Sequence, residues 1–144
     1  MKSKYKVVAY DTDYGFVSEW YFQDIENANE WVRELESNYG RDCAHVIYLD
    51  KKVQLCESRH IVLGDIDGYI FPNTIDDVTN VVELEEIALN SITKLGETSH
   101  LDIYVTGLTV ALIATLNVAR KCNIDVTLLH YDRESGKYFS QHVD

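Results

Sequence analysis

Cysteine, proline and basic residues are all scarce in this chain of 144 residues, and each scarcity excludes a class of protein. The three cysteines have no Cys-x-x-Cys spacing and the five histidines form no His-x-x-x-His pair, so no local motif predicts a disulfide framework or a metal site. A single proline and a hydrophobic content of 46% argue against long disorder. We expect a sizeable core with no metal or cofactor, in which Cys43 and Cys122 are buried reduced thiols.

Long apolar runs are also lacking. The longest candidate, residues 108–119, is interrupted by polar residues, whereas a membrane span needs about 18 to 20 predominantly apolar residues. The first residues are basic, but Asp11 and Asp13 arrive too early for the apolar core of a signal peptide. These patterns predict a cytoplasmic protein with no membrane partner.

Basic residues are outnumbered by acidic ones, 13 to 24, which gives a formal net charge of −11. Proteins bind duplex nucleic acid largely by neutralising phosphates with Lys and Arg, so the charge argues against direct binding to duplex DNA or RNA. Residues 100–144 carry four basic and five acidic side chains, a net charge of −1, which leaves −10 for residues 1–99. An anionic ligand would meet least repulsion in the C-terminal part. The acidic N-terminal part can also be read simply as a solubilising surface.

The first sixty residues have the pattern of strands around one helix. Two β-rich runs flank a turn-forming cluster at residues 11–15, and residues 24–40 show a helical period that begins at Asp24 and ends at Gly40. The apolar stripe of this helix is Ala28, Trp31, Val32, Leu35 and Tyr39. Further strands are predicted at residues 43–49 and 53–63. We therefore predict an α/β chain in which residues 1–60 form an antiparallel ββαββ unit.

Residues 61–144 have the pattern of a mostly parallel sheet. A helix is predicted over residues 74–96, with Thr74 and Asp77 as its start signal. Its predicted buried stripe is Val78, Val81, Val82, Ala88, Leu89 and Ile92. Residues 101–106, 108–122 and 124–131 then read as strand, helix and strand, and a hairpin leads to an antiparallel edge strand. We predict a Rossmann-like three-layer unit, packed with the first unit or continuous with it in one compact domain.

The main candidate site is the turn between the strand and the helix of this βαβ unit. Ligands of open α/β sheets bind outside the carboxyl ends of the parallel strands, and a helix N-terminus offers free N–H groups to an anion. The predicted ligand-binding residues are Thr106, Gly107, Leu108, Thr109, Tyr131 and Arg133. The alternative is an ordinary turn in which a threonine caps the helix. The GxGxxG and GxxxxGK[ST] motifs are absent, which argues against ordinary NAD or ATP chemistry.

Residues 101–136, LDIYVTGLTVALIATLNVARKCNIDVTLLHYDRESG, resemble the second signature region of CRISPR-associated Rossmann fold (CARF) domains and their small stand-alone relatives. The positions that match are Thr106, Gly107, Thr109 and, more loosely, Tyr131. Leu108 stands in place of a second glycine and Val110 in place of the usual lysine. The resemblance implies a binder of cyclic oligoadenylate second messengers at a two-fold dimer interface, with at most slow ring cleavage.

Two functions of different classes follow as expectations. The first is a homo-oligomeric, cytoplasmic binder of a cyclic-oligonucleotide messenger in antiviral defence. The second is an acidic, phage-type anti-defence protein that binds a basic surface of a nucleic-acid-processing protein. A hydrolytic enzyme is a third alternative. It has no Ser-His-Asp order or nucleophile elbow in the sequence, so its catalytic groups would have to be assembled by the fold alone.

Overall fold

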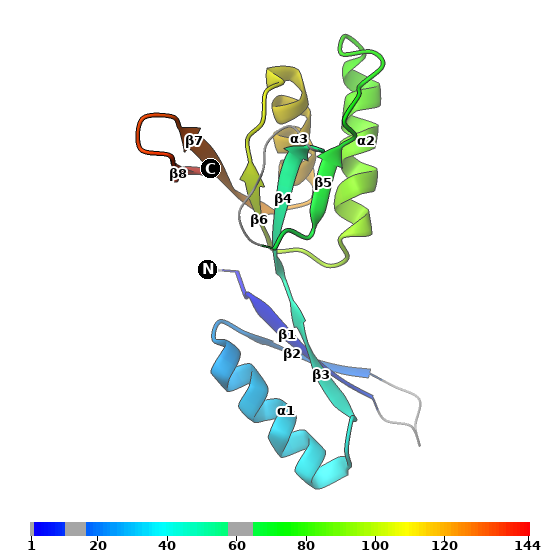
Figure 1. The fold of residues 1–144 in the computed structure, drawn as a ribbon. Coiled ribbons are helices and arrows are strands. Elements are labelled where there is room, and N and C mark those ends of the chain that lie inside the picture. The colour runs from blue at the N-terminus through cyan, green and yellow to red at the C-terminus, as the bar shows by residue number, and fades with distance from the viewer. Residues whose placement is uncertain (1, 11–16, 58–64) are drawn as a thin grey trace. The chain divides into compact units, whose positions relative to one another are not determined.

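The structure is a computed structural model, and it describes residues 2–10, 17–57 and 65–144 (Figure 1). The chain divides into two compact units, Met1–Asp50 and Lys51–Asp144. In the described ranges, three helices accompany a three-stranded antiparallel sheet and a five-stranded, mostly parallel sheet. The α/β class predicted from the sequence is confirmed. The hairpin loop predicted at residues 11–15 lies outside the described residues.

The first unit packs one helix against one face of an antiparallel sheet. Its elements are β1 (Tyr5–Tyr10), β2 (Val17–Phe22), α1 (Ile25–Tyr39) and β3 (Ala44–Tyr48), with the strand order β2-β1-β3. Asp24 caps α1 as predicted, because its Oδ1 accepts a hydrogen bond from the N–H of Glu26 at 2.7 Å. Ala28 and Leu35 are buried against the sheet. Tyr39, predicted to share their stripe, is 78% exposed because it is the last residue of the helix, beyond the core.

The second unit is a five-stranded sheet with a parallel interior. Its elements are β4 (Asp50–Cys56), β5 (Gly68–Phe71), α2 (Val81–Lys94), β6 (His100–Tyr104), α3 (Thr109–Lys121), β7 (Asp125–Asp132) and β8 (Lys137–Val143). The strand order is β5-β4-β6-β7-β8. β6 pairs in parallel with β7 across the α3 crossover, and β8 pairs antiparallel to β7 at the edge. The predicted βαβ unit and its antiparallel edge strand are both confirmed.

Two architectural predictions need correction. β4 was predicted as the last strand of the first unit, but it pairs with β5 in the second sheet, so the first unit is ββαβ and not ββαββ. In addition, the described part of the second unit has two layers and not three. α2 and α3 contact each other and share one core with the sheet, so both helices lie on the same face. The strand pattern predicts buried positions but not the sheet that each strand joins.

α2 starts later than the sequence predicted, and only part of its predicted buried stripe is confirmed: Ala88 and Ile92 are buried. Its N-cap is Asn80, whose Oδ1 accepts a hydrogen bond from the N–H of Glu83 at 3.1 Å. Its buried residues are Leu84, Ala88 and Ile92, whereas Val78, Val81, Val82 and Leu89 are exposed. Apolar residues occur on several sides of this helix, so the periodicity alone leaves the phase of the buried stripe open.

α3 ends in a Schellman motif. Asn123 adopts φ 56, and the N–H groups of Asn123 and Ile124 donate back to carbonyls of the last turn at 3.1 and 2.9 Å. The sequence predicts Asn123 as the C-cap of this helix, but the C-cap is Cys122, and Asn123 is the residue after it, in the left-handed conformation. Cys122, which is the C-cap, is exposed and not buried as predicted, while Cys56 is the buried thiol and Cys43 is half-buried.

Glu85 joins α2 to α3 and provides a pH-dependent contribution to stability. Its carboxylate accepts hydrogen bonds from Asn117 Nδ2 at 3.1 Å and from Lys121 Nζ at 3.3 Å. The bond from Asn117 first, and then that from Lys121, hold the pKa of Glu85 below its usual value. A carboxyl whose pKa is lowered by folding contributes stability above its unfolded pKa, and that contribution is lost as the pH falls through the folded pKa.

We therefore expect Glu85→Gln to lower the free energy of unfolding at neutral pH and to have little effect in strong acid, where both proteins carry a neutral side chain. Urea unfolding at several pH values measures this difference. Glu86→Gln is the matched control, because Glu86 is exposed on the same helix. A difference between Glu85→Gln and the unchanged protein that stays constant with pH would contradict the assignment.

Candidate functional site

The second sheet contains a point at which the chain changes direction. From β4 the chain continues to β5 on one side, and later through α2 to β6 on the other side of β4. The arrowheads of β4, β5 and β6 point the same way in Figure 1, so their carboxyl ends lie at one edge of the sheet. Open α/β sheets bind ligands at such a switch point, outside the carboxyl ends of the strands. We name this place the switch edge and define it by Cys56, Thr106, Gly107 and the first turn of α3.

A side-chain hydrogen bond joins the two strand ends at the switch edge. The backbone N–H of Cys56, the last residue of β4, donates to Oγ1 of Thr106 at 3.2 Å. Thr106 is only 1% exposed. Its hydroxyl, predicted from the sequence as a direct contact for a ligand, therefore lies beneath the surface and holds the end of β4 beside the turn that follows β6. Thr106 thus positions the backbone of the site and does not line it.

The turn after Thr106 presents backbone groups, and not polar side chains, to a ligand. Gly107 has φ 98, a conformation that favours glycine, and no described atom lies within 4 Å of the place where a Cβ would stand. The N-cap of α3 is Leu108, and no side-chain hydrogen bond caps the helix. Thr109 is the first helical residue and is exposed. The alternative of a threonine-capped turn is therefore wrong, and the first N–H groups of α3 have no side-chain cap.

Three tyrosines gather where β6, β7 and β8 lie side by side, and we call them the tyrosine cluster: Tyr104, Tyr131 and Tyr138. The ring centroids of Tyr104 and Tyr138 are 4.9 Å apart with the planes at 84°, and those of Tyr131 and Tyr138 are 5.4 Å apart. Burial, and then the neighbouring phenols, raise the pKa of Tyr138 above its usual value. Because Tyr131 is 51% exposed, the cluster offers one accessible ring supported by two others.

The register of the sheet places the tyrosine cluster near the switch edge. The N–H of Val105 donates to the carbonyl of Leu129 at 3.0 Å. Thr106, the next residue, therefore lies beside the end of β7 that carries Tyr131. Tyr104 alternates with the buried Ile103, so the cluster lies on the face of the sheet away from α2 and α3. The structure thus brings Tyr131 and the predicted turn to the same end of the sheet.

Arg133 lies in the hairpin turn that follows β7. The preceding Asp132 shapes this turn, because its carboxylate accepts hydrogen bonds from the N–H groups of Glu134 and Ser135, each at 3.2 Å. The hydrogen bond from the Ser135 side chain, and then that from the Glu134 backbone, lower the pKa of Asp132. Arg133 is exposed and forms no ion pair with another described residue, so its charge is available to an anion.

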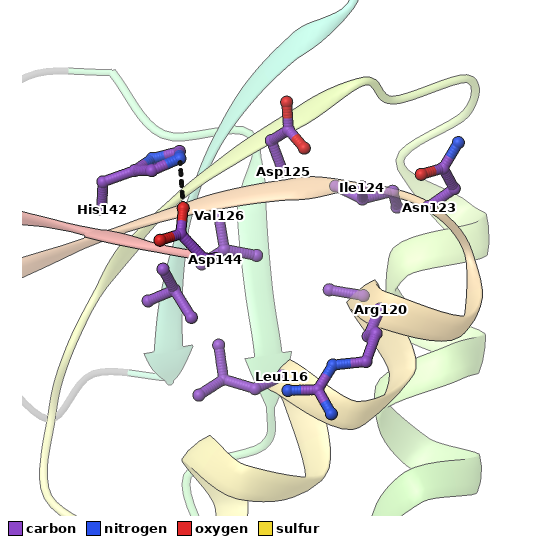
Figure 2. Close-up of a pocket in the computed structure, with 10 residues that line it drawn as sticks. Leu116, Arg120, Asn123, Ile124, Asp125, Val126, His142 and Asp144 are labelled. Carbon is purple, nitrogen blue, oxygen red and sulfur yellow. Dashed lines mark ion pairs between the residues drawn. The ribbon is translucent and has the colours of Figure 1, made fainter.

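A pocket of about 230 Å³, which no sequence motif indicates, lies at the other end of α3 (Figure 2). Its apolar wall includes Leu116, Val126 and Val143, and its polar rim includes Arg120, His142 and Asp144. Figure 2 shows the His142–Asp144 ion pair beside it, at 3.8 Å. The pocket is smaller than the roughly 300 to 1,000 Å³ of typical small-molecule sites. We therefore keep the switch edge as the candidate ligand site.

Comparison with protein-family models, with curated proteins and with solved structures gave no match. Within the described ranges, no group of three or more His, Cys, Asp or Glu side chains is arranged to hold a metal ion. Nor does any helix in those ranges have both the length and the apolar character needed to cross a membrane.

Proposed function

We propose that the protein binds a nucleotide of the cyclic-oligonucleotide class at the switch edge. A phosphate group is held at the N-terminus of α3, and a base stacks on the tyrosine cluster. The observation that carries the proposal is the uncapped first turn of α3 at a topological switch point, with an exposed tyrosine ring at the same end of the sheet. The CARF-like stretch at residues 101–136 supports the same ligand class.

The phosphate part of the proposal rests on the electrostatics of α3. A helix N-terminus carries about half a unit of positive charge and several N–H groups without intrahelical partners. The first turn of α3 contains no acidic residue, and Gly107 leaves room for a ligand to approach the backbone. Residues 100–144 have a net charge of only −1. Arg133 adds a cation at the next strand end.

The base part of the proposal rests on Tyr131. A base stacked on an aromatic side chain contributes about 1 to 3 kcal/mol, as measured by alanine substitution. Tyr138 packs against Tyr131 and also against Tyr104, which holds the three rings in a fixed arrangement. A ring with this support loses little freedom when a base stacks on it.

Titration calorimetry with cyclic di-, tri- and tetra-adenylates tests the proposal, and we expect at least one of them to bind. Tyr131→Ala should then raise the dissociation constant roughly 5- to 150-fold, which corresponds to the loss of one stacked base. Tyr39→Ala is the matched control, because Tyr39 is more exposed still and lies on α1 in the other unit. Absence of binding by a folded protein to every member of the panel would overturn the proposal.

A second candidate function, recognition of a basic protein surface, is favoured by the outer face of α1. Glu26, Glu30 and Glu34 follow one another at helical spacing and are all exposed. Like charges at this spacing destabilise a helix, so the row is more readily explained by a partner than by stability. Binding that weakens steeply with salt and is lost in the triple Glu→Gln variant would support this function. Nucleotide binding should be unaffected by the same variant.

A further inference from the structure

β8 is an edge strand of the second sheet that is neither short, bulged nor interrupted by proline, and in the described residues no further strand pairs with it. All seven of its residues pair with β7 in an unbroken register from Lys137 to Val143. β8 is the last strand in the sheet order, so its other side has no partner strand in the described residues. Natural edge strands are commonly short, charged, bulged or interrupted by proline. β5, at the opposite edge, fits that rule because it has four residues and is followed by Pro72.

The side chains of β8 suit pairing with another strand. Lys137, at its start, is its only Lys, Arg, Asp or Glu residue. Phe139 is 56% exposed, and its ring stacks on His130 with centroids 5.2 Å apart. β8 contains no acidic residue, so two copies that pair through it bring no carboxylate of this strand into the contact.

We propose that β8 pairs antiparallel with β8 of a second copy of this chain, about a two-fold axis at Ser140. The two five-stranded sheets then form one continuous sheet of ten strands. The proposal concerns the backbone edge of β8 and not the switch edge, although Tyr138 belongs both to β8 and to the tyrosine cluster. A monomer that binds nucleotide would leave the proposed function standing.

The strand itself selects this register. Ser140 is the midpoint of β8, so an axis there pairs all seven residues, whereas an axis one residue away pairs only five. With Ser140 at the axis, Tyr138 faces His142 and Phe139 faces Gln141 of the other copy. No two like charges are opposed, and a small side chain occupies the crowded centre.

The pocket at the end of α3 provides a place for Phe139 of the second copy. Phe139, Gln141 and Val143 alternate onto the face of the sheet that carries α3, because Val143 packs against the core. Phe139 of the second copy, opposite Gln141, is therefore a diagonal neighbour of Val143, within reach of an aromatic side chain. Val143 lines the apolar wall of the pocket together with Leu116 and Val126, the last two of which are labelled in Figure 2. Burial of this exposed ring would supply an apolar contact at each end of the strand pair.

Opposed charges at the two-fold axis provide the test. Sedimentation velocity over a range of concentrations should show that the unchanged protein dimerises. Ser140→Glu and Ser140→Lys should each raise the dimer dissociation constant about tenfold or more, because two like charges then face each other at the axis. An equimolar mixture of the two variants should regain dimers, now with one copy of each. Ser37→Glu, on the exposed face of α1, is the control and should dimerise like the unchanged protein.

A cross-link tests the register itself. Ser140→Cys in a Cys122→Ser background should form a disulfide-linked dimer on mild oxidation, since directly opposed residues of antiparallel strands have suitable Cα separations. The same change at Ser37 should not. A protein that stays monomeric at all concentrations would overturn the proposal. So would a dimer that is unaffected by both charged variants, or a mixture that fails to recover.

Discussion

Leu84→Ala should lower the free energy of unfolding by about 2 to 5 kcal/mol, whereas Leu89→Ala should lower it by less than about 1 kcal/mol. Both residues lie in α2, and both changes delete the same atoms and gain the same small increase in helix propensity. Leu84 is 1% exposed and packs in the core of the second unit, whereas Leu89 is 45% exposed. The difference between the variants therefore measures burial alone.

Urea unfolding followed by circular dichroism gives both free energies. The comparison also tests the phase of α2, because periodicity in the sequence places Leu89 in the buried stripe and the structure places Leu84 there. A larger decrease in the free energy of unfolding for Leu89→Ala than for Leu84→Ala would show that Leu89 is the buried residue, as the sequence predicts. Equal decreases would contradict both the sequence prediction and the structure.

The sequence predicts the second half of this fold well where one pattern has only one interpretation. β6 and β7 are short and mostly apolar, α3 lies between them, and Asn123 takes the left-handed conformation that ends the helix. A strand, a helix and a strand in succession leave a parallel pair as the natural solution. Asp24 and Gly40 bound α1 for similarly local reasons, a side-chain cap and a positive φ.

The incorrect predictions concern features that depend on contacts between segments far apart in the sequence. β4 follows β3 directly, so the sequence predicts both strands in the same sheet, but strand composition does not tell which strands pair. The phase of α2 depends on which apolar side meets the sheet. Of the tyrosine cluster, Tyr131 alone was predicted, because Tyr104 and Tyr138 become its neighbours only through the order β6-β7-β8. The one sequence signal for Tyr104 and Tyr138 is the alternation of the two faces along β6 and β8.

Substitution of Thr106 by valine removes only the hydroxyl, so it tests whether that hydroxyl has a structural role or binds the ligand directly. Thr106→Val keeps the shape of the side chain but removes the acceptor for the buried N–H of Cys56, which is bonded at 3.2 Å. The loss of a buried hydrogen-bond partner costs about 1 to 3 kcal/mol, so we expect that decrease in the free energy of unfolding. Thr106→Ser retains the acceptor and should recover part of the loss. Thr109→Val, at an exposed position, should change stability by less than about 0.5 kcal/mol.

The same variants test the role of Thr106 in the proposed nucleotide binding. Because Thr106 is buried, Thr106→Val should weaken nucleotide binding in proportion to any loosening of the turn, and Thr106→Ser should restore the affinity together with the stability. A direct hydroxyl contact would instead give a variant of unchanged stability and much reduced affinity. Calorimetric titration and urea unfolding of one protein preparation distinguish the two cases. Unchanged stability in Thr106→Val would show that the hydrogen bond between Thr106 and Cys56 contributes nothing to the fold, and the structural role assigned to Thr106 would be wrong.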